Sequence, residues 1–244
     1  MKKIQIIFLF FMFIASRSFA VDYNASAFGC VSDGQTNNTR SIQAAIDLIS
    51  SKGGGTLNFY VGRYLTGGLE LKSNVTIQLH EGAILVANPS FYDFIEKNGK
   101  RYFIYAENQS NIKIVGKGVI LGQAAATIKQ LAKLQQNAVL PKESKNPILI
   151  GIKDCKQVTV EGLHVEDAAS DVYVIENSSE ISISNQIIQS LSVPNSNAFV
   201  LSNVQDLNMD KIYIDVTGKS FIKDHNSKTI VIKNSVNKEG KSIK

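Results

Sequence analysis

Between residues 103 and 236 the apolar positions repeat as one short unit. Each copy has an apolar strand of period 2, an Asn or Asp, three small or polar residues, and a second apolar strand. We call the Asn and Asp positions the anchors. They are Asn108, Asp154, Asn177, Asn203 and Asn226, spaced by 46, 23, 26 and 23 residues. A fixed period in this range, with strand alternation inside each unit, predicts a β-solenoid.

The side chains four and two residues before each anchor are expected to point into the core. These pairs are Ile104/Ala106, Ile150/Ile152, Tyr173/Ile175, Phe199/Leu201 and Ile222/Asp224. One coil cannot bury its apolar face alone, so the coils are expected to stack with their strands in parallel. The anchors suit a sharp left-handed turn, and stacked asparagines would form an amide ladder of purely structural role.

The chain before the repeat predicts a cap. Within residues 41–51 the apolar positions have helical spacing, and Asn38 with Thr39 can cap the helix. Three glycines at 53–55 end it and allow a tight turn. Residues 21–70 are therefore expected to form an N-terminal capping helix and the first strands.

Residues 124–146 interrupt the repeat and are rich in Ala, Gln, Lys and Leu. They predict a helix or a long loop, and they explain the 46-residue spacing as two periods of 23. Loops that leave a β-helix can form a wall of its groove. A surface insertion is the favoured interpretation, followed by the last coils over 147–244 of one domain that spans 21–244.

Residues 1–20 resemble a secretory signal. Lys2 and Lys3 precede an apolar run over 4–14, and Ser18 and Ala20 fit a small-x-small cleavage site. We expect cleavage after Ala20 and a secreted protein, extracellular or periplasmic, with no membrane span afterwards. A retained N-terminal anchor is the alternative.

The charge, the cysteines and the histidines of the chain argue against a nucleic-acid-binding protein, a disulfide scaffold and a metalloprotein. Removing residues 1–20 takes away three basic residues and no acid, so the net charge falls from +5 to +2, and nothing indicates a nucleic-acid partner. Cys30 and Cys155 lie in separate segments, which favours two buried or half-buried thiols over a disulfide scaffold. His80, His164 and His225 are isolated, so neither a metal site nor another cofactor is expected.

Several motifs resemble known families. Residues 28–34, Thr39, 42–46, 53–55 and 64–67 resemble the opening of pectin-degrading right-handed parallel β-helix proteins, which tailspikes and some lyases share. Two further blocks, 71–77 with 81–85 and 111–112 with 116–123, resemble the polygalacturonases of glycoside hydrolase family 28. The family usually has Asp where Leu121 stands. The resemblance is dense over 27–123 and loose over 146–243.

This resemblance implies an all-β fold, a right-handed parallel β-helix. It also implies a glycosidase acting on an acidic plant polysaccharide such as pectin, homogalacturonan or rhamnogalacturonan. Polygalacturonases are inverting hydrolases, which need two carboxyl groups roughly 6.5–9.5 Å apart. The family places its acids in an Asn-Thr-Asp-Gly motif and, one coil on, in a Gly-Asp-Asp motif. A His-Gly motif and an Arg-Ile-Lys motif follow.

The matching positions of this chain lack those acids. Asn197 stands at the Asp of the first motif, while Lys219 and Ser220 stand at both carboxylates of the second. Glu239 lies near the His-Gly position, and the chain ends at Lys244, before an Arg-Ile-Lys motif. An amide cannot exchange the catalytic proton as a carboxyl group does. The matching therefore predicts weak or lost catalysis, as in a pseudoenzyme.

Other acids could take over the chemistry. Asp171 lies six residues before Asn177, one coil below Asn197, where the family tends to have Trp. It is a candidate relocated acid, with a solvent-facing Asp at a strand start as the structural alternative. Asp224 and Asp215 are further candidates, and Asp215 is expected on another face.

Four lysines make the last coils basic, at positions 219, 223, 228 and 233. They could attract an acidic polysaccharide or blunt an exposed sheet edge. The favoured interpretation is a secreted protein of pectin metabolism, descended from family-28 hydrolases, with weak or lost activity. Three alternatives stay open: an active carbohydrate enzyme using Asp171, a non-catalytic module that binds acidic glycans, and a C-terminally truncated gene product.

Overall fold

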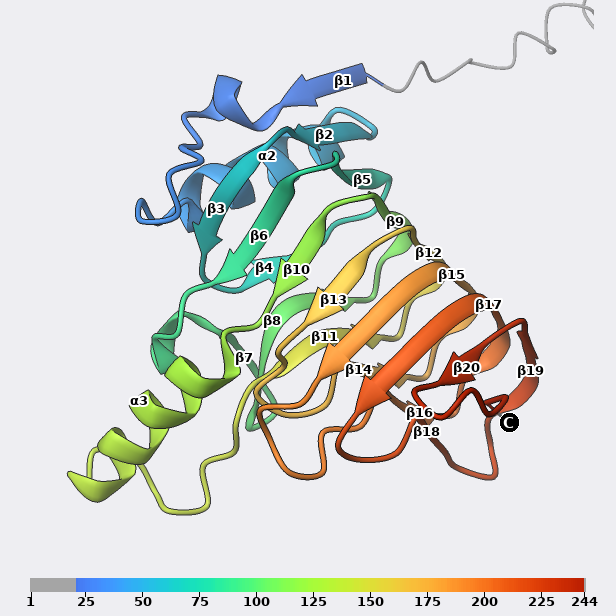
Figure 1. Ribbon diagram of the computed structural model, residues 1–244. Helices are drawn as coiled ribbons and strands as arrows, with labels where there is room; N and C mark the ends of the chain where they lie inside the picture. Colours follow the sequence, from blue (N-terminus) through green and yellow to red (C-terminus); the bar gives the residue numbers. More distant parts are fainter. Residues whose placement is uncertain (1–20, 244) are drawn as a thin grey trace, which may run out of the picture.

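The computed structural model describes residues 21–243, so the predicted signal peptide lies outside the described residues. The chain winds as a right-handed parallel β-helix whose coils stack along one axis (Figure 1). The fold predicted from the repeat and from the family motifs is confirmed.

Each coil contributes strands to three faces. The first face is a seven-stranded sheet made of β4 (Leu69–Glu70), β8 (Lys100–Glu107), β11 (Ile148–Lys153), β14 (Tyr173–Glu176), β16 (Phe199–Ser202) and β18 (Phe221–Lys223), with β7 (Ile95–Lys97) antiparallel to β8. The parallel strands of this face come from successive coils. Their outer side carries the groove described below.

The second and third faces join into one thirteen-stranded sheet, because β15 (Ser179–Ser190) and β17 (Gln205–Val216) run through the corner between them. The second face also contains β1 (Val21–Asn24), β2 (Gly55–Phe59), β5 (Val75–Leu79), β9 (Ser110–Gly116), β12 (Lys156–Glu161) and β19 (Lys228–Lys233). The third face also contains β3 (Gly62–Thr66), β6 (Ala83–Ala87), β10 (Val119–Leu121), β13 (His164–Glu166) and β20 (Val236–Asn237).

In-register pairing stacks apolar side chains in the core. Ile104 pairs with Ile150, Ile150 with Tyr173, and Tyr173 with Phe199. The Tyr173 and Phe199 rings stack with centroids 4.9 Å apart. Four of the five predicted inward pairs are buried. Period-2 alternation therefore identified the core positions of these coils.

The fifth predicted pair is wrong. Phe199 pairs with Phe221 and Leu201 with Lys223, whereas Gln205 pairs with Lys228. The turn of the last coil thus holds one more residue than the turn below it. Ile222 consequently stacks on Val200, and Asp224 lies in the turn instead of pointing inward.

Asp224 has a structural role in that turn. Its carboxylate accepts hydrogen bonds from Ser202 Oγ at 3.0 Å and from the backbone N–H of Asn203 at 3.1 Å. Ser227 Oγ donates a third at 2.7 Å. Asp224 therefore joins the last coil to the one below, and it does not line the groove.

Four of the five anchors adopt the expected left-handed turn, and Asn226 does not. Asn108, Asp154, Asn177 and Asn203 have left-handed backbones, with φ of 56°, 50°, 49° and 52°. Asn203 Nδ2 donates to Asn177 Oδ1 at 3.1 Å. This is one step of the predicted amide ladder. The ladder does not extend to Asn226, because the extra residue in the last turn shifts the register there.

The N-terminal end is capped by η2 (Ala25–Phe28) and α2 (Thr39–Ser51) (Figure 1). The predicted apolar stripe of α2 is fully buried and comprises Ile42, Ala45, Ile46 and Ile49. Asn38 does not cap the helix; Asn37 Oδ1 accepts the Thr39 N–H at 3.0 Å instead. The buried Asn38 amide holds the preceding loop, accepting from Val31 N and donating to Leu65 O.

The remaining predictions concern thiols, metals and membranes. Cys30 and Cys155 are free and buried, as predicted, and burial raises the pKa of the Cys30 thiol to about 11. Residues 21–243 contain no group of three His, Cys, Asp or Glu side chains that could hold a metal ion. In this same part of the chain, no helix is long and apolar enough to cross a membrane.

Candidate functional site

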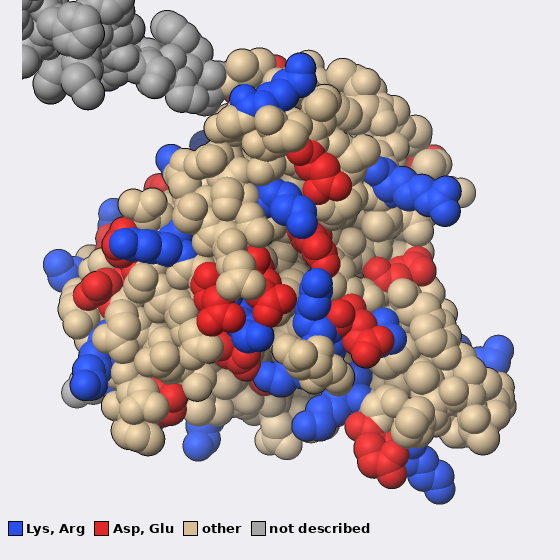
Figure 2. Space-filling view, turned by 180° about the vertical axis from the view of Figure 1, so that it is seen from behind, with Lys and Arg blue, Asp and Glu red and all other residues tan. Residues whose placement is uncertain are grey.

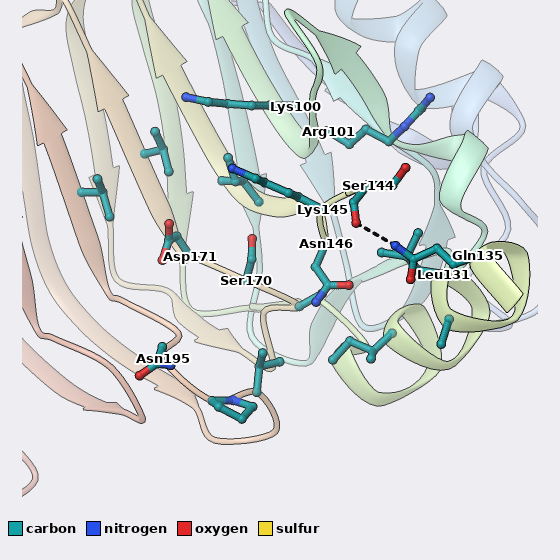
Figure 3. Close-up of a pocket in the computed structure, with 18 of the residues that line it drawn as sticks. Lys100, Arg101, Leu131, Gln135, Ser144, Lys145, Asn146, Ser170, Asp171 and Asn195 are labelled. Atoms are coloured by element: carbon teal, nitrogen blue, oxygen red, sulfur yellow. Dashed lines mark hydrogen bonds between the residues drawn. The ribbon is translucent and has the colours of Figure 1, made fainter. Parts of the chain in front are cut away.

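A groove of about 650 Å³ lies along the outer side of the first face. Its floor includes Ile148, Val174 and Val200, from β11, β14 and β16. One side is the corner between the third and first faces, with Ser170, Asp171, Pro194 and Asn195. The opposite wall is α3 (Ala124–Gln136) and the segment that follows it (Figure 3).

The insertion at 124–146 is thus part of the groove, and the expected plain surface insertion is corrected. Leu131 on α3 is buried and lines the groove. Gln130 Oε1 accepts the N–H of Phe91, in η3 (Phe91–Asp93), at 2.6 Å. Asp167, at the end of a third-face strand, fixes the start of α3, because its Oδ2 accepts the Ala124 N–H at 3.0 Å.

The floor beside the groove carries two tyrosines in place of an aliphatic layer. Tyr102 and Tyr105 lie against each other with ring centroids 4.5 Å apart. They lie over Gly151, where a Cβ would be 2.4 Å from Tyr102 Cδ1. Burial, reinforced by Glu176 and Glu107, raises the pKa of Tyr102 to about 12. The glycine therefore makes room for rings whose hydroxyls stay neutral.

A row of charges runs along the same face at the residue before each of the first three anchors. Glu107 and Glu176 are its acids, and Lys153 stands between them. Lys153 Nζ lies 2.8 Å from Glu107, and Lys100 Nζ lies 2.7 Å from Glu176. The hydrogen bond from Lys153 lowers the pKa of Glu107. Figure 2, a view onto this side of the molecule, shows the two signs of charge interleaved.

Asp171, which lines the groove, is linked to two other predicted site residues on the coils above it. Asn197 lies one coil above Asp171, as predicted: its Nδ2 donates to Asp171 Oδ1 at 2.8 Å, and its backbone N–H donates to the same atom at 3.2 Å. Asn197 Oδ1 then accepts the backbone N–H of Lys219 at 2.9 Å. Three successive coils are linked through one amide side chain.

Two other predicted positions lie elsewhere. Lys219, not Ser220, stacks above Asn197, because the extra residue in the last turn shifts the count back from Asn226 by one. Glu239 is exposed in the turn after β20, 2.8 Å from Lys241, and does not line the groove. Asp215 lies on the third face near Lys238, as predicted.

The groove holds more cations than anions. Its charged lining comprises Lys100, Arg101, Lys142, Lys145, Asp171 and Glu176. Lys100 pairs with Glu176, and Arg101 pairs with Glu96 at 2.9 Å. Within residues 21–243, Asp171, Lys142 and Lys145 form no ion pair. The groove therefore offers one unpaired carboxylate and two unpaired ammonium groups.

Sequence reasoning missed part of this lining. Glu176 carried a usable signal, since the residue before an anchor must face outward when the second residue before it faces inward. Lys100 pairs with Glu176 across two coils. No pattern in the sequence indicates that contact. Lys142 and Lys145 follow a non-repetitive helix, so only the fold brings them to the groove.

The coils and the groove define a right-handed parallel β-helix protein with a groove along one of its sheets. The family model of glycosyl hydrolases family 28 matches residues 55–243, and the chain belongs to this family. The predicted resemblance is thereby confirmed.

Individual proteins agree with this assignment. The chain is 37% identical to a solved candidate glycosyl hydrolase from Parabacteroides merdae, covering 90% of this chain and 99% of that one with a TM-score of 0.86. It also matches an exo-poly-alpha-D-galacturonosidase from Dickeya chrysanthemi, at 33% identity over 41% of this chain and 19% of that protein. An exopolygalacturonase from Thermotoga maritima shares the fold, with a TM-score of 0.74 at 19% identity over 89% of this chain and 60% of that one. The chain spans about a fifth of the length of the first curated relatives it matches.

Proposed function

We propose that this protein binds a pectin-type acidic polysaccharide in the groove of its first face and hydrolyses it weakly or not at all. One observation carries the proposal. Asp171 lines the groove, and Asn197 and Lys219 stack beside it on the next two coils. This stack supplies one carboxylate where inverting hydrolysis requires two.

The neighbouring groups do not replace the missing acid. The Asn197 amide donates to Asp171 and accepts from Lys219, and an amide does not act as an acid or a base at neutral pH. Glu176 also lines the groove, but its carboxylate is already engaged in an ion pair with the Lys100 ammonium 2.7 Å away.

A second candidate is an active carbohydrate enzyme that uses Asp171. It is favoured by the position of Asp171 in the groove without an ion pair. Asp171→Asn should then abolish turnover, and turnover retained by that variant would exclude the candidate. A matched control is Asp210→Asn, which changes the same charge on the outer side of β17, away from the groove.

A binding function makes a distinct prediction. Retention on immobilised polygalacturonan should fall as salt rises, because screening weakens attraction between the ammonium groups and the uronates. No new reducing ends should form. Salt-insensitive retention, or none from folded protein, would contradict the proposal.

Export is part of the proposal. Residues 1–20 fit a signal peptide, with Lys2 and Lys3 before an apolar run and a small-x-small cleavage site at Ser18 and Ala20. Expression of the full sequence in a secreting bacterial host should give a protein whose intact mass corresponds to an N-terminus at Val21. A mature protein that still carries residues 1–20 would contradict this.

A further inference from the structure

The segment that follows α3 lines the groove, and the function proposed above gives it no role of its own. We infer that residues 142–146 form the wall that recognises the carboxylates of a polyuronate, with Lys142 and Lys145 determining specificity for unesterified chains. This inference rests on the proposed function and names the ligand groups and the residues that select them.

Positive charge distinguishes this wall from the rest of the groove. Lys142 and Lys145 are exposed, line the groove and form no ion pair within residues 21–243. Glu143 lies between them in sequence, yet it neither lines the groove nor pairs with either lysine. The other lining cations, Lys100 and Arg101, already have carboxylate partners. The free positive charge of the groove is therefore concentrated on this wall.

The wall is held in place by hydrogen bonds from α3. Gln135, near the end of α3, donates from one side-chain amide to three backbone carbonyls, of Pro141, Lys142 and Ser144, at 3.4, 3.0 and 3.0 Å. The Gln135–Ser144 contact is drawn in Figure 3, where the Lys145 side chain extends in the same direction as Lys100. A preorganised wall loses less conformational entropy when a ligand binds.

The floor and the corner of the groove would orient a bound polyuronate. Ile148, Val174 and Val200 give an apolar floor that suits the faces of sugar rings. Asp171 at the corner would repel a uronate carboxylate, since like charges at short range are unfavourable. A bound polyuronate should therefore turn its carboxylates toward Lys142 and Lys145. Methyl esterification would remove that attraction.

A pair of double variants tests this inference. Lys142→Gln/Lys145→Gln removes the two wall charges, and Lys129→Gln/Lys133→Gln removes two exposed charges from the same insertion outside the groove lining. Binding of the mature protein is measured by calorimetry with de-esterified polygalacturonate and with the same polymer fully methyl-esterified. Far-UV circular dichroism checks that each variant is folded.

We expect the wall variant to bind the de-esterified polymer about 5- to 10-fold more weakly, with a flatter salt dependence. Each partly exposed ion pair between a wall lysine and a uronate contributes modestly to binding, and the two losses add. The control variant should stay within about twofold of wild type. Equal losses in both variants, or no loss in the wall variant, would overturn the inference while leaving the proposed function intact. Failure of wild type to bind either polymer would overturn the proposed function itself.

Discussion

Asp171 Oδ1 accepts a hydrogen bond of 2.8 Å from Asn197 Nδ2, one coil further along the solenoid. The acceptor lines the groove and forms no ion pair within residues 21–243. Because the same Asn197 side chain accepts from the Lys219 N–H, it forms a structural link between three coils.

Replacing Asn197 by Ala should test that link. The variant loses two side-chain hydrogen bonds and leaves Asp171 with fewer donors, so we expect the free energy of unfolding to fall by about 1–2 kcal/mol. Urea denaturation measures the change. Asn208→Ala on an outward position of β17 is the control, because its side chain is exposed and forms no hydrogen bond to residues 21–243. Equal loss in both variants would show that the link contributes nothing.

Gly151 should be intolerant of a side chain. An added Cβ would lie 2.4 Å from Tyr102 Cδ1 and 2.9 Å from Tyr105 Cδ2, so Gly151→Ala should destabilise the protein by about 1–3 kcal/mol through overpacking. In a Tyr102→Ala background the same substitution should cost much less. A thermodynamic cycle of the four proteins measures the coupling, and additive effects would contradict the proposed clash.

Asp167 should control the order of the groove wall. It carries negative charge beside the first turn of α3, which favours the helix through its dipole. Asp167→Asn keeps the left-handed backbone acceptable, but it should speed amide exchange in the first turn of α3, corresponding to a loss of about 0.3–1 kcal/mol. Asp206→Asn, which changes the same charge at an exposed position that is also left-handed, should leave α3 unchanged. Identical exchange in both variants would refute the role of Asp167.

The last coil should be sensitive to acid. Hydrogen bonds led by the one from Ser227 lower the pKa of Asp224 from 3.8 to about 2. Since the folded-state pKa is the lower one, the charged group contributes stability above pH 3.8 that is lost as pH falls toward about 2. Hydrogen exchange of β18 and β19, corrected for intrinsic rates, should rise over this window in wild type. It should show a smaller pH dependence in Asp224→Asn; equal pH dependence would contradict the assignment.

Much of the fold followed from the sequence because the repeat specifies it at two levels. Period-2 alternation identified buried residues such as Ile150 and Phe199, and the anchors marked turns that only a few residue types tolerate. The last copy was misread because one residue is added inside a turn, between Lys223 and Asn226, where no apolar position reports the shift.

The candidate site was only partly readable. Asp171 and Asn197 were placed correctly because they lie at equal distances from their anchors. Ser220 was misplaced by the same added residue. Lys145 belongs to an irregular segment, so its approach to the groove depends on the tertiary contacts of α3, which no local pattern encodes.

The most direct test of the central claim combines two measurements on one sample. Mature protein of verified fold is incubated with polygalacturonan, and retention on the polymer and release of reducing ends are followed together. We predict salt-sensitive retention with no reducing ends above a heat-inactivated control. Reducing-end release that the Asp171→Asn variant abolishes would contradict the account and identify an active hydrolase.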